Sequence, residues 1–183
     1  MFEDILRRIA QQFEGAGLPY MVIGGQAVLL YGEPRLTKDI DVTLGATLDR
    51  LPAVLELVKA AGLEPLVDPE QFTRETMVLP CRDPGTEVRV DLIFSFSPYE
   101  RQALERARSV ELAGGQVRFA SLEDVIVHKV IAGRPRDMED VEGMLIKNPG
   151  TDLEYVRSWL QDFADSLGEP FKERFEEVLE DSR

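Results

Sequence analysis

Two short apolar segments, joined by a glycine pair and a helical stretch, constrain the fold of this chain more than any other feature. Residues 19–23 read PYMVI and lead directly into Gly24 and Gly25, and residues 39–44 read DIDVTL. β-Branched and aromatic residues of this kind favour strands, whereas the stretch GQAVLLYG between the two segments is typical of a short helix closed by Gly32. The pattern predicts a strand, a glycine turn, a helix and a second strand.

The placement of two aspartates inside the second of these strands is the most unusual part of the pattern. Asp39 and Asp41 are separated by one residue, so in a strand both side chains project from the same face. Strands are depleted in Asp, and two ionised carboxylates on one face repel each other. A divalent cation would compensate for that repulsion, and Mg²⁺ prefers carboxylate oxygens and shares its coordination with substrate phosphates.

A third acid has the right setting to complete such a site. Residues 86–95 read TEVRVDLIFS, in which apolar residues alternate with Arg89, Asp91 and Ile93. The alternation turns Asp91 away from the buried face of the expected strand. A third carboxylate on a neighbouring strand is what a two-metal site requires. A salt bridge from Asp91 to Arg89 is the alternative interpretation.

Length and composition indicate an α/β fold with a small mixed sheet. The chain has 183 residues and is 44% hydrophobic, which is enough for a sizeable core. No apolar run reaches the roughly 20 residues of a membrane span, and the amphipathic, acid-containing N-terminus is typical of a helix rather than a targeting peptide. Because Cys81 is the only cysteine, no intrachain disulfide is possible and we expect a cytoplasmic protein.

The charge distribution bears on possible partners. The net charge of −13 argues against broad, charge-driven binding to nucleic acid, so we expect no DNA partner. Residues 101–136 nevertheless contain seven basic and four acidic residues. This local excess suits a phosphate-bearing ligand and leaves RNA possible, although solvated helix surface explains such a run equally well.

The order of predicted elements divides the chain into a catalytic core over residues 1–120 and a C-terminal helical segment over residues 121–183. In the core we expect helices at 2–13, 51–61 and 98–108, strands at 75–83 and 86–95, and a hairpin at 110–120 with its turn at AGG. In the second segment Ser121 opens a helix. Gly133 ends that helix, and Pro135 suits the first turn of the next one.

Taken together, these motifs resemble a known family. The stretch GGQAVLLYGEPRLTKDIDV with the later VDLIF is similar to the nucleotidyltransferase superfamily that includes DNA polymerase β. More narrowly, it resembles the minimal and AbiEii-like nucleotidyltransferases of bacterial toxin–antitoxin systems. SLEDVIVHKVIAGRPRDMEDV resembles the helical segment of that group. The resemblance covers residues 20–144.

The resemblance implies roles for individual residues. The acids Asp39, Asp41 and Asp91 would be catalytic and would bind the metal, with two Mg²⁺ ions expected and Mn²⁺ possible. The residues implied in nucleotide binding are Gly24, Gly25, Arg35, Thr37, Lys129 and Arg134. Many superfamily members have Gly-Ser at the glycine pair, and Gly25 lacks that serine hydroxyl. For Lys129 a helix-surface position is an equal alternative, and Arg134 can instead form an ion-pair network with Asp137 and Asp140.

The implied function is transfer of a nucleoside monophosphate from a nucleoside triphosphate to a hydroxyl. A toxin–antitoxin context would make the acceptor a partner protein or a tRNA, whereas an antibiotic enzyme would modify an aminoglycoside or lincosamide. A second class of function is a module that keeps the fold and binds a nucleotide or a partner without turnover. A phosphohydrolase is disfavoured, because His128 is the only histidine in the chain.

Overall fold

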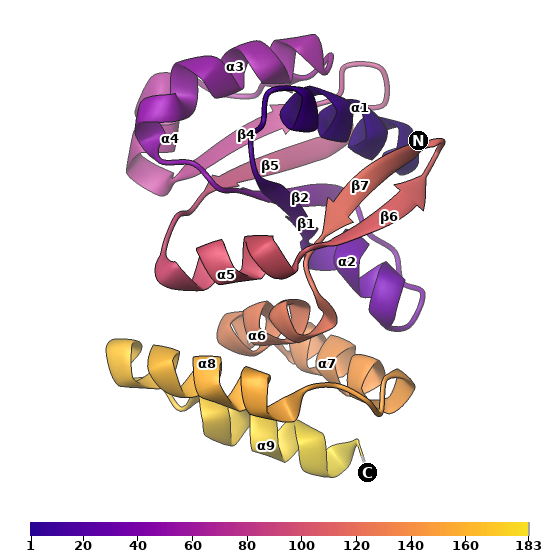
Figure 1. Cartoon of the computed structure of the whole chain (residues 1–183), viewed down its shortest axis with the longest axis vertical. Helices are drawn as coiled ribbons and strands as arrows, with labels where there is room; N and C mark the ends of the chain where they lie inside the picture. The colour runs from indigo at the N-terminus through magenta and orange to yellow at the C-terminus, as the bar shows by residue number, and fades with distance from the viewer. Residues whose placement is uncertain (183) are drawn as a thin grey trace. The chain divides into compact units, whose positions relative to one another are not determined.

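A seven-stranded mixed sheet forms the framework of the structure, a computed structural model that describes residues 1–182 (Figure 1). Across the sheet the strands run in the order β3-β4-β5-β2-β1-β7-β6. β2 pairs in parallel with β5 and antiparallel with β1. The strands are β1 (Tyr20–Ile23), β2 (Asp39–Leu44), β3 (Glu64–Pro65), β4 (Val78–Arg82), β5 (Arg89–Phe94), β6 (Arg108–Leu112) and β7 (Gly115–Phe119).

The helices precede, connect and follow these strands. They are α1 (Phe2–Gly15), α2 (Gly24–Tyr31), α3 (Leu51–Ala60) after the short 3-10 helix at Leu48–Arg50, α4 (Pro69–Thr76), α5 (Pro98–Arg106), α6 (Leu122–Ala132), α7 (Pro135–Lys147), α8 (Leu153–Leu167) and α9 (Phe171–Asp181). The chain is therefore α/β up to Phe119 and helical afterwards, as the sequence predicts. Within the described residues, no helix combines the length and hydrophobicity that crossing a membrane requires.

The contacts group the chain into two units that are not contiguous in sequence. The first comprises Met1–Gln26 and Thr37–Ala120 and contains the whole sheet. The second comprises Ala27–Leu36 and the helices from Ser121 onward. Residues 27–36, which the sequence places within the core segment 1–120, thus belong with the C-terminal helices.

The core of the first unit lies on one face of the sheet. Phe13 of α1 packs edge-on against Tyr20, with ring centroids 5.7 Å apart. Tyr20 pairs with Leu44, so both share the face that α1 covers. Figure 1 shows α3 beside α1 over this face. Ile40 and Val42 are fully buried and point to the same side as Leu44, which leaves the odd-numbered residues of β2 on the opposite face.

Local sequence signals explain where most elements begin and end. The β6–β7 hairpin turns through Ala113 and Gly114, both at positive φ, which confirms the predicted hairpin. In the second unit the Ser121 side chain accepts a hydrogen bond from the Asp124 amide at the start of α6, and Gly133 ends α6 at φ +64°. Pro135 occupies the first turn of α7. These helix boundaries confirm the sequence prediction.

The segment between α3 and β4 differs most from the sequence prediction. It contains β3, only two residues long, and α4. The N-terminal signal of α4 was present, since Asp68 caps the helix by accepting from the Gln71 amide and Pro69 follows it. Because α4 extends to Thr76, β4 begins at Val78, later than the predicted strand at residues 75–83.

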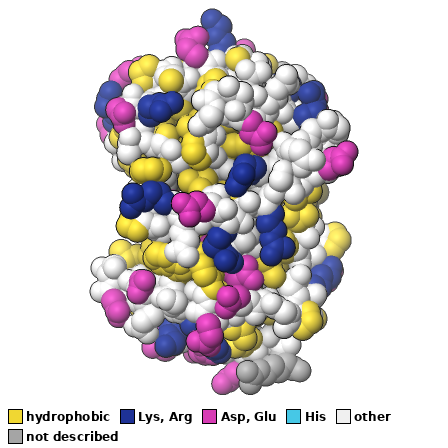
Figure 2. Space-filling view, in the orientation of Figure 1, with side chains coloured by type: hydrophobic (Ala, Val, Ile, Leu, Met, Phe, Trp, Pro, Cys, Tyr) yellow, Lys and Arg dark blue, Asp and Glu magenta, His cyan; other side chains and the backbone are white. Residues whose placement is uncertain are grey.

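Charged side chains of both signs are interspersed on the face shown in Figure 2. The basic residues of segment 101–136 do not act as one solvated surface. Lys129 is only 6% exposed, and Arg118 donates to the backbone oxygens of Leu104 and Ala107 at 3.1 and 3.2 Å. Part of the positive charge of this segment is therefore engaged in contacts within the protein rather than exposed to solvent.

Candidate active site

The parallel pairing of β2 with β5 brings two of the predicted acids side by side. Asp41 is the register partner of Asp91, and Asp39 is the partner of Arg89. Neighbouring strands lie roughly 4.8 Å apart, so these four residues form a compact square on the face opposite α1. Ile40 and Val90, between them in each strand, are fully buried on the other face. The burial pattern therefore orients the acids.

Gly24 brings the backbone that follows β1 close to the same acids. Asp41 pairs with Ile23, the last residue of β1, and Gly24 then begins α2 with φ +64°. A Cβ atom built on Gly24 would collide with the Oδ2 atom of Asp41. Glycine is thus required here both for the left-handed conformation and for the close approach of the backbone to a carboxylate. The first turn of α2 contains no acidic side chain, which suits an anionic ligand at that helix end.

Arg89 is the cation of this cluster, and the sequence pattern indicates it only as an alternative partner of Asp91. Its Nε atom donates to both carboxylate oxygens of Asp91, at 2.8 and 3.0 Å. The hydrogen bond to Asp91 raises the pKa of Arg89 above its usual value, and the negative charges of Asp91, Asp39 and Asp41 act in the same direction. The three acids and Arg89 together have a formal charge of −2, the charge that one divalent cation balances.

The residues of this cluster fit a divalent metal by chemistry. Their donors are carboxylate oxygens, which Mg²⁺ prefers, and two of them share one strand face. Within residues 1–182 no group of three or more His, Cys, Asp or Glu side chains is gathered closely enough to hold an ion. In the arrangement observed, both carboxylate oxygens of Asp91 accept from Arg89.

Thr37, a predicted nucleotide-binding residue, is held against the start of α2. The Nε2 atom of Gln26 donates to the Thr37 hydroxyl oxygen at 2.8 Å, and Gln26 is only 8% exposed. This bond ties the segment entering β2 to the first turn of α2, so it supports the position of Asp39, two residues further on. The sequence pattern does not indicate Gln26, because a glutamine at the start of a helix has no distinctive signature.

Gly25 follows Gly24 in the first turn of α2. The three basic residues predicted to bind nucleotide lie instead in the second unit, where each forms an ion pair. Lys129 of α6 contacts Asp137 at 2.6 Å and Asp140 at 2.9 Å. Arg134 contacts Asp137 at 2.6 Å, and Arg35 contacts Asp140 at 3.2 Å. Burial raises the pKa of Asp137, but hydrogen bonds from Arg134 and Lys129 outweigh that effect and hold the pKa below its usual value. We refer to these five residues as the α6–α7 ion-pair network.

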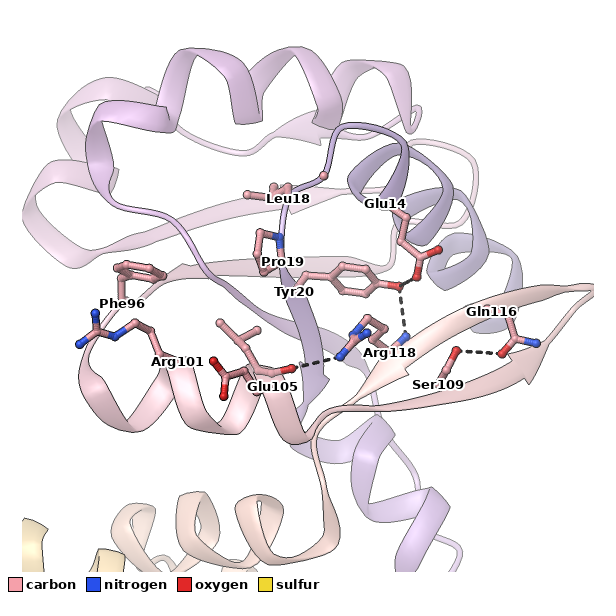
Figure 3. A pocket seen from close by; sticks show the side chains of 12 residues that line it. Glu14, Leu18, Pro19, Tyr20, Phe96, Arg101, Glu105, Ser109, Gln116 and Arg118 are labelled. Atoms are coloured by element: carbon pink, nitrogen blue, oxygen red, sulfur yellow. Dashed lines mark hydrogen bonds between the residues drawn. The ribbon is translucent and has the colours of Figure 1, made fainter.

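A separate cavity of about 780 Å³ lies in the first unit, at the other end of β1 from Gly24 (Figure 3). Tyr20 at its wall donates to Glu14 at 3.3 Å and accepts from the Arg118 amide at 3.1 Å. Burial is the main cause that raises the pKa of Tyr20 to about 12. Arg101 lies over the Phe96 ring, 5.4 Å from its centroid. No predicted site residue lines this cavity.

Several solved structures have a similar fold. An antigenic nucleotidyltransferase-like protein from Paracoccidioides brasiliensis is 18% identical, with a TM-score of 0.58 over 93% of this chain and 91% of that chain. The solution structure of the antibiotic-resistance factor ANT(2'')-Ia is 15% identical, with a TM-score of 0.61 over 91% of this chain and 94% of that chain. A crystal structure of ANT(2'')-Ia in complex with adenylyl-2''-tobramycin is 17% identical, with a TM-score of 0.57 over 85% and 94%. These similarities show the fold.

Sequence comparison identifies the family. No curated protein matches the chain. A family model described as "Nucleotidyltransferase of unknown function (DUF6036)" matches residues 2–179, nearly the whole chain. The match includes β1, Gly24, both acid-bearing strands and all of the helices up to most of α9. The chain therefore belongs to this nucleotidyltransferase family.

Proposed function

We propose that the protein is a metal-dependent nucleotidyltransferase that moves a nucleoside monophosphate from a nucleoside triphosphate to a hydroxyl acceptor. The observation that supports this most directly is the pairing of Asp41 with Asp91 across the β2–β5 ladder, with Asp39 on the same strand face. Gly24, packed against Asp41, supplies backbone at the place where a phosphate would approach. Family membership points to the same reaction class.

In the proposed reaction, the acceptor oxygen attacks the α-phosphorus while the bond from that phosphorus to the pyrophosphate oxygen breaks. Asp39, Asp41 and Asp91 would hold the divalent cations, Mg²⁺ or Mn²⁺, which when bound stabilise charge on the entering and leaving oxygens. Asp91 also accepts the acceptor proton in this proposal. The amide groups of Gly24 and Gly25 bind phosphate oxygens at the start of α2, and the acid face positions both reactants.

The acceptor divides into three candidates. A toxin–antitoxin role would use a hydroxyl of a partner protein or of a tRNA. A small polyhydroxylated acceptor is supported by the similarity in fold to ANT(2'')-Ia, an antibiotic-resistance factor solved in complex with adenylyl-2''-tobramycin. The net charge of −13 favours a cationic small molecule over RNA.

The test is incubation of the purified protein with Mg²⁺, cell lysate and each α-³²P-labelled nucleoside triphosphate, followed by separation of protein, RNA and small molecules. We expect label in one fraction only. That fraction identifies the class of acceptor, and the triphosphate that gives the label identifies the nucleotide base. Asp41→Asn should reduce labelling about a thousandfold or more without loss of folded structure. Asp49→Asn, the same chemical change at an exposed residue outside the cluster, should have no effect. Equal labelling by both variants would end the assignment of Asp41.

A further inference from the structure

Arg89 occupies the position that a metal ion would need at Asp91. Its Nε atom lies 2.8 and 3.0 Å from the two oxygens of the same carboxylate, so it sits on the open side of that group. A metal bound by both oxygens requires the same space. A metal bound by one of them would lie next to the positive guanidinium. Arg89 and a divalent cation would therefore compete for the Asp91 carboxylate.

The surroundings of Arg89 allow it to leave. Its side chain is 54% exposed, whereas that of Asp91 is 17% exposed. Arg89 is at the start of β5, and its register partner on β2 is Asp39, the more exposed of the two β2 acids. The guanidinium is thus anchored to the acid face by one carboxylate, and more than half of the Arg89 side chain is open to solvent.

The face that Arg89 shares with the acids is also the face at which the triphosphate would bind in the proposed function. A guanidinium has five N–H donors in a planar arrangement that matches phosphate oxygens. Once released from Asp91, Arg89 therefore still lies on the face where the anion would bind. Its guanidinium remains positively charged at any physiological pH.

We propose that Arg89 is an exchangeable counter-ion of the acid cluster: it holds Asp91 when no metal is bound, and a divalent cation displaces it so that its guanidinium binds the triphosphate. This inference rests on the proposed function, since it assumes that the acids hold a metal. It adds a residue that the sequence pattern of the family motifs does not identify, and it makes metal and nucleotide binding mutually dependent.

Arg89→Ala provides the test, and Arg82→Ala is its matched control. Arg82 of β4 is the register partner of Arg89 on the other side of β5, and it forms exposed ion pairs with Glu87 and Glu64. The two substitutions remove the same charge from adjacent positions of one sheet. Titration calorimetry with Mn²⁺ measures metal affinity without nucleotide, and titration of the Mn²⁺-loaded protein with non-hydrolysable triphosphate analogues of the four bases measures nucleotide affinity.

We expect Arg89→Ala to bind Mn²⁺ about tenfold more tightly than the unmodified protein, because no cation has to be displaced. The same variant should bind the triphosphate analogue about tenfold more weakly once Mn²⁺ is present. Arg82→Ala should change either affinity by less than about twofold. Arg89→Lys, which keeps the charge but not the planar donors, should lie between Arg89→Ala and the unmodified protein in both titrations.

Two results would overturn the inference, and they are distinguishable. If the unmodified protein binds Mn²⁺, Asp41→Asn abolishes that binding, and Arg89→Ala leaves it unchanged or weakens it, the metal site stands and the exchange of Arg89 is wrong. If neither the unmodified protein nor Arg89→Ala binds Mn²⁺ with or without nucleotide, the metal site itself is wrong, and the proposed function loses its mechanism along with the inference.

Discussion

Gly24 is the single residue on which the geometry of the acid cluster depends most directly. Its positive φ is a conformation that side chains with a Cβ rarely adopt, and its Cα faces the Asp41 carboxylate with no room for another atom. The two requirements are separate, because a glycine can meet one without the other. Gly114 in the β6–β7 turn also has positive φ, but a Cβ there would meet nothing within 4 Å.

We predict that Gly24→Ala abolishes nucleotide transfer and lowers the free energy of unfolding by about 2–3 kcal/mol, of which about 1 kcal/mol comes from the left-handed backbone. Gly114→Ala should cost only that backbone part and leave activity intact. Urea denaturation of both variants and labelling assays measure the difference. Equal destabilisation by the two substitutions would show that Asp41 moves aside without cost and that the close packing is unimportant.

At the scale of elements, the β2–β5 ladder shows how much of the site the sequence predicts. The period of two in DIDV and VRVDLIF places Asp39, Asp41 and Asp91 on the polar faces of their strands, as expected. Which strands are neighbours does not follow from the pattern, because residues 45–88 separate β2 from β5 and contain two other strands. Arg89 was also recognisable, since it is two residues before Asp91 and must share its face. The structure contains both the predicted Arg89–Asp91 salt bridge and the pairing of Asp41 with Asp91.

The α6–α7 ion-pair network illustrates what the sequence left open. Whether Lys129 was a surface lysine or a ligand contact could not be decided from SLEDVIVHKV, because both are consistent with a helix. Lys129 is instead buried between Asp137 and Asp140. A lysine in that position balances the charge of two buried carboxylates, so in this structure Lys129 stabilises the second unit.

We predict that Lys129→Met lowers the free energy of unfolding by about 3–5 kcal/mol, because it leaves two buried acids without their shared cation. Lys147→Met is the matched control. Lys147 ends α7 and pairs with the exposed Glu33, so its loss should cost about 1 kcal/mol or less. Thermal unfolding followed by circular dichroism compares the two. A cost for Lys129→Met no greater than that of the control would mean that the acids are protonated or hydrated once the lysine is removed.

A buried acid of the first unit, Asp83, joins three of its elements. Arg8 of α1 donates to Asp83, which precedes β5, and also to the Ala61 oxygen after α3. Burial raises the pKa of Asp83, but hydrogen bonds from Thr86 and Arg8 outweigh it and hold the pKa below its usual value. The folded state therefore binds a proton at Asp83 less readily than the unfolded chain does.

Because the pKa of Asp83 is lowered in the folded protein, we predict that Asp83→Asn lowers the free energy of unfolding by an amount that depends on pH. Above about pH 4, the usual pKa of an unfolded aspartate, the ionised Asp83 stabilises the folded state by about 1–2 kcal/mol relative to Asn. As the pH falls through the lowered pKa of the folded protein, that contribution disappears. Melting temperatures of the two proteins from pH 7 to pH 3 should converge at the acid end. A constant difference would mean that packing, not charge, explains the cost.

At the scale of the whole molecule, the chain leaves the first unit after Gln26 and returns at Thr37. Residues 27–36, the segment between these two points, are attached to α7 and the residue that follows it through several polar contacts. Lys147 donates to the Gly32 oxygen at 2.9 Å, and Asn148 donates to the Tyr31 oxygen at 2.9 Å. Arg35 pairs with Asp140. The segment that leads into β2 is therefore stabilised by residues more than 100 positions away.

We predict that a fragment ending at residue 120 is cut rapidly by trypsin after Arg35, because that fragment lacks every one of these α7 partners. The full chain should resist cleavage there, and adding a peptide of residues 121–183 to the fragment should restore part of the resistance. Cleavage after Arg50, exposed and within the first unit, provides an internal reference. Equal cleavage rates after Arg35 in the fragment and the full chain would show that residues 27–36 hold their conformation without the helices.

The parallel pairing of β2 with β5 has a consequence for biosynthesis. During translation Asp39 and Asp41 emerge early, but the strand that places Asp91 beside Asp41 follows only after residues 45–88, and β5 must then insert between β2 and β4. Closing a loop of this length is a long-range event that slows folding. In the nascent chain, the edge of β2 that pairs with β5 therefore lacks its partner strand until Phe94 has left the ribosome.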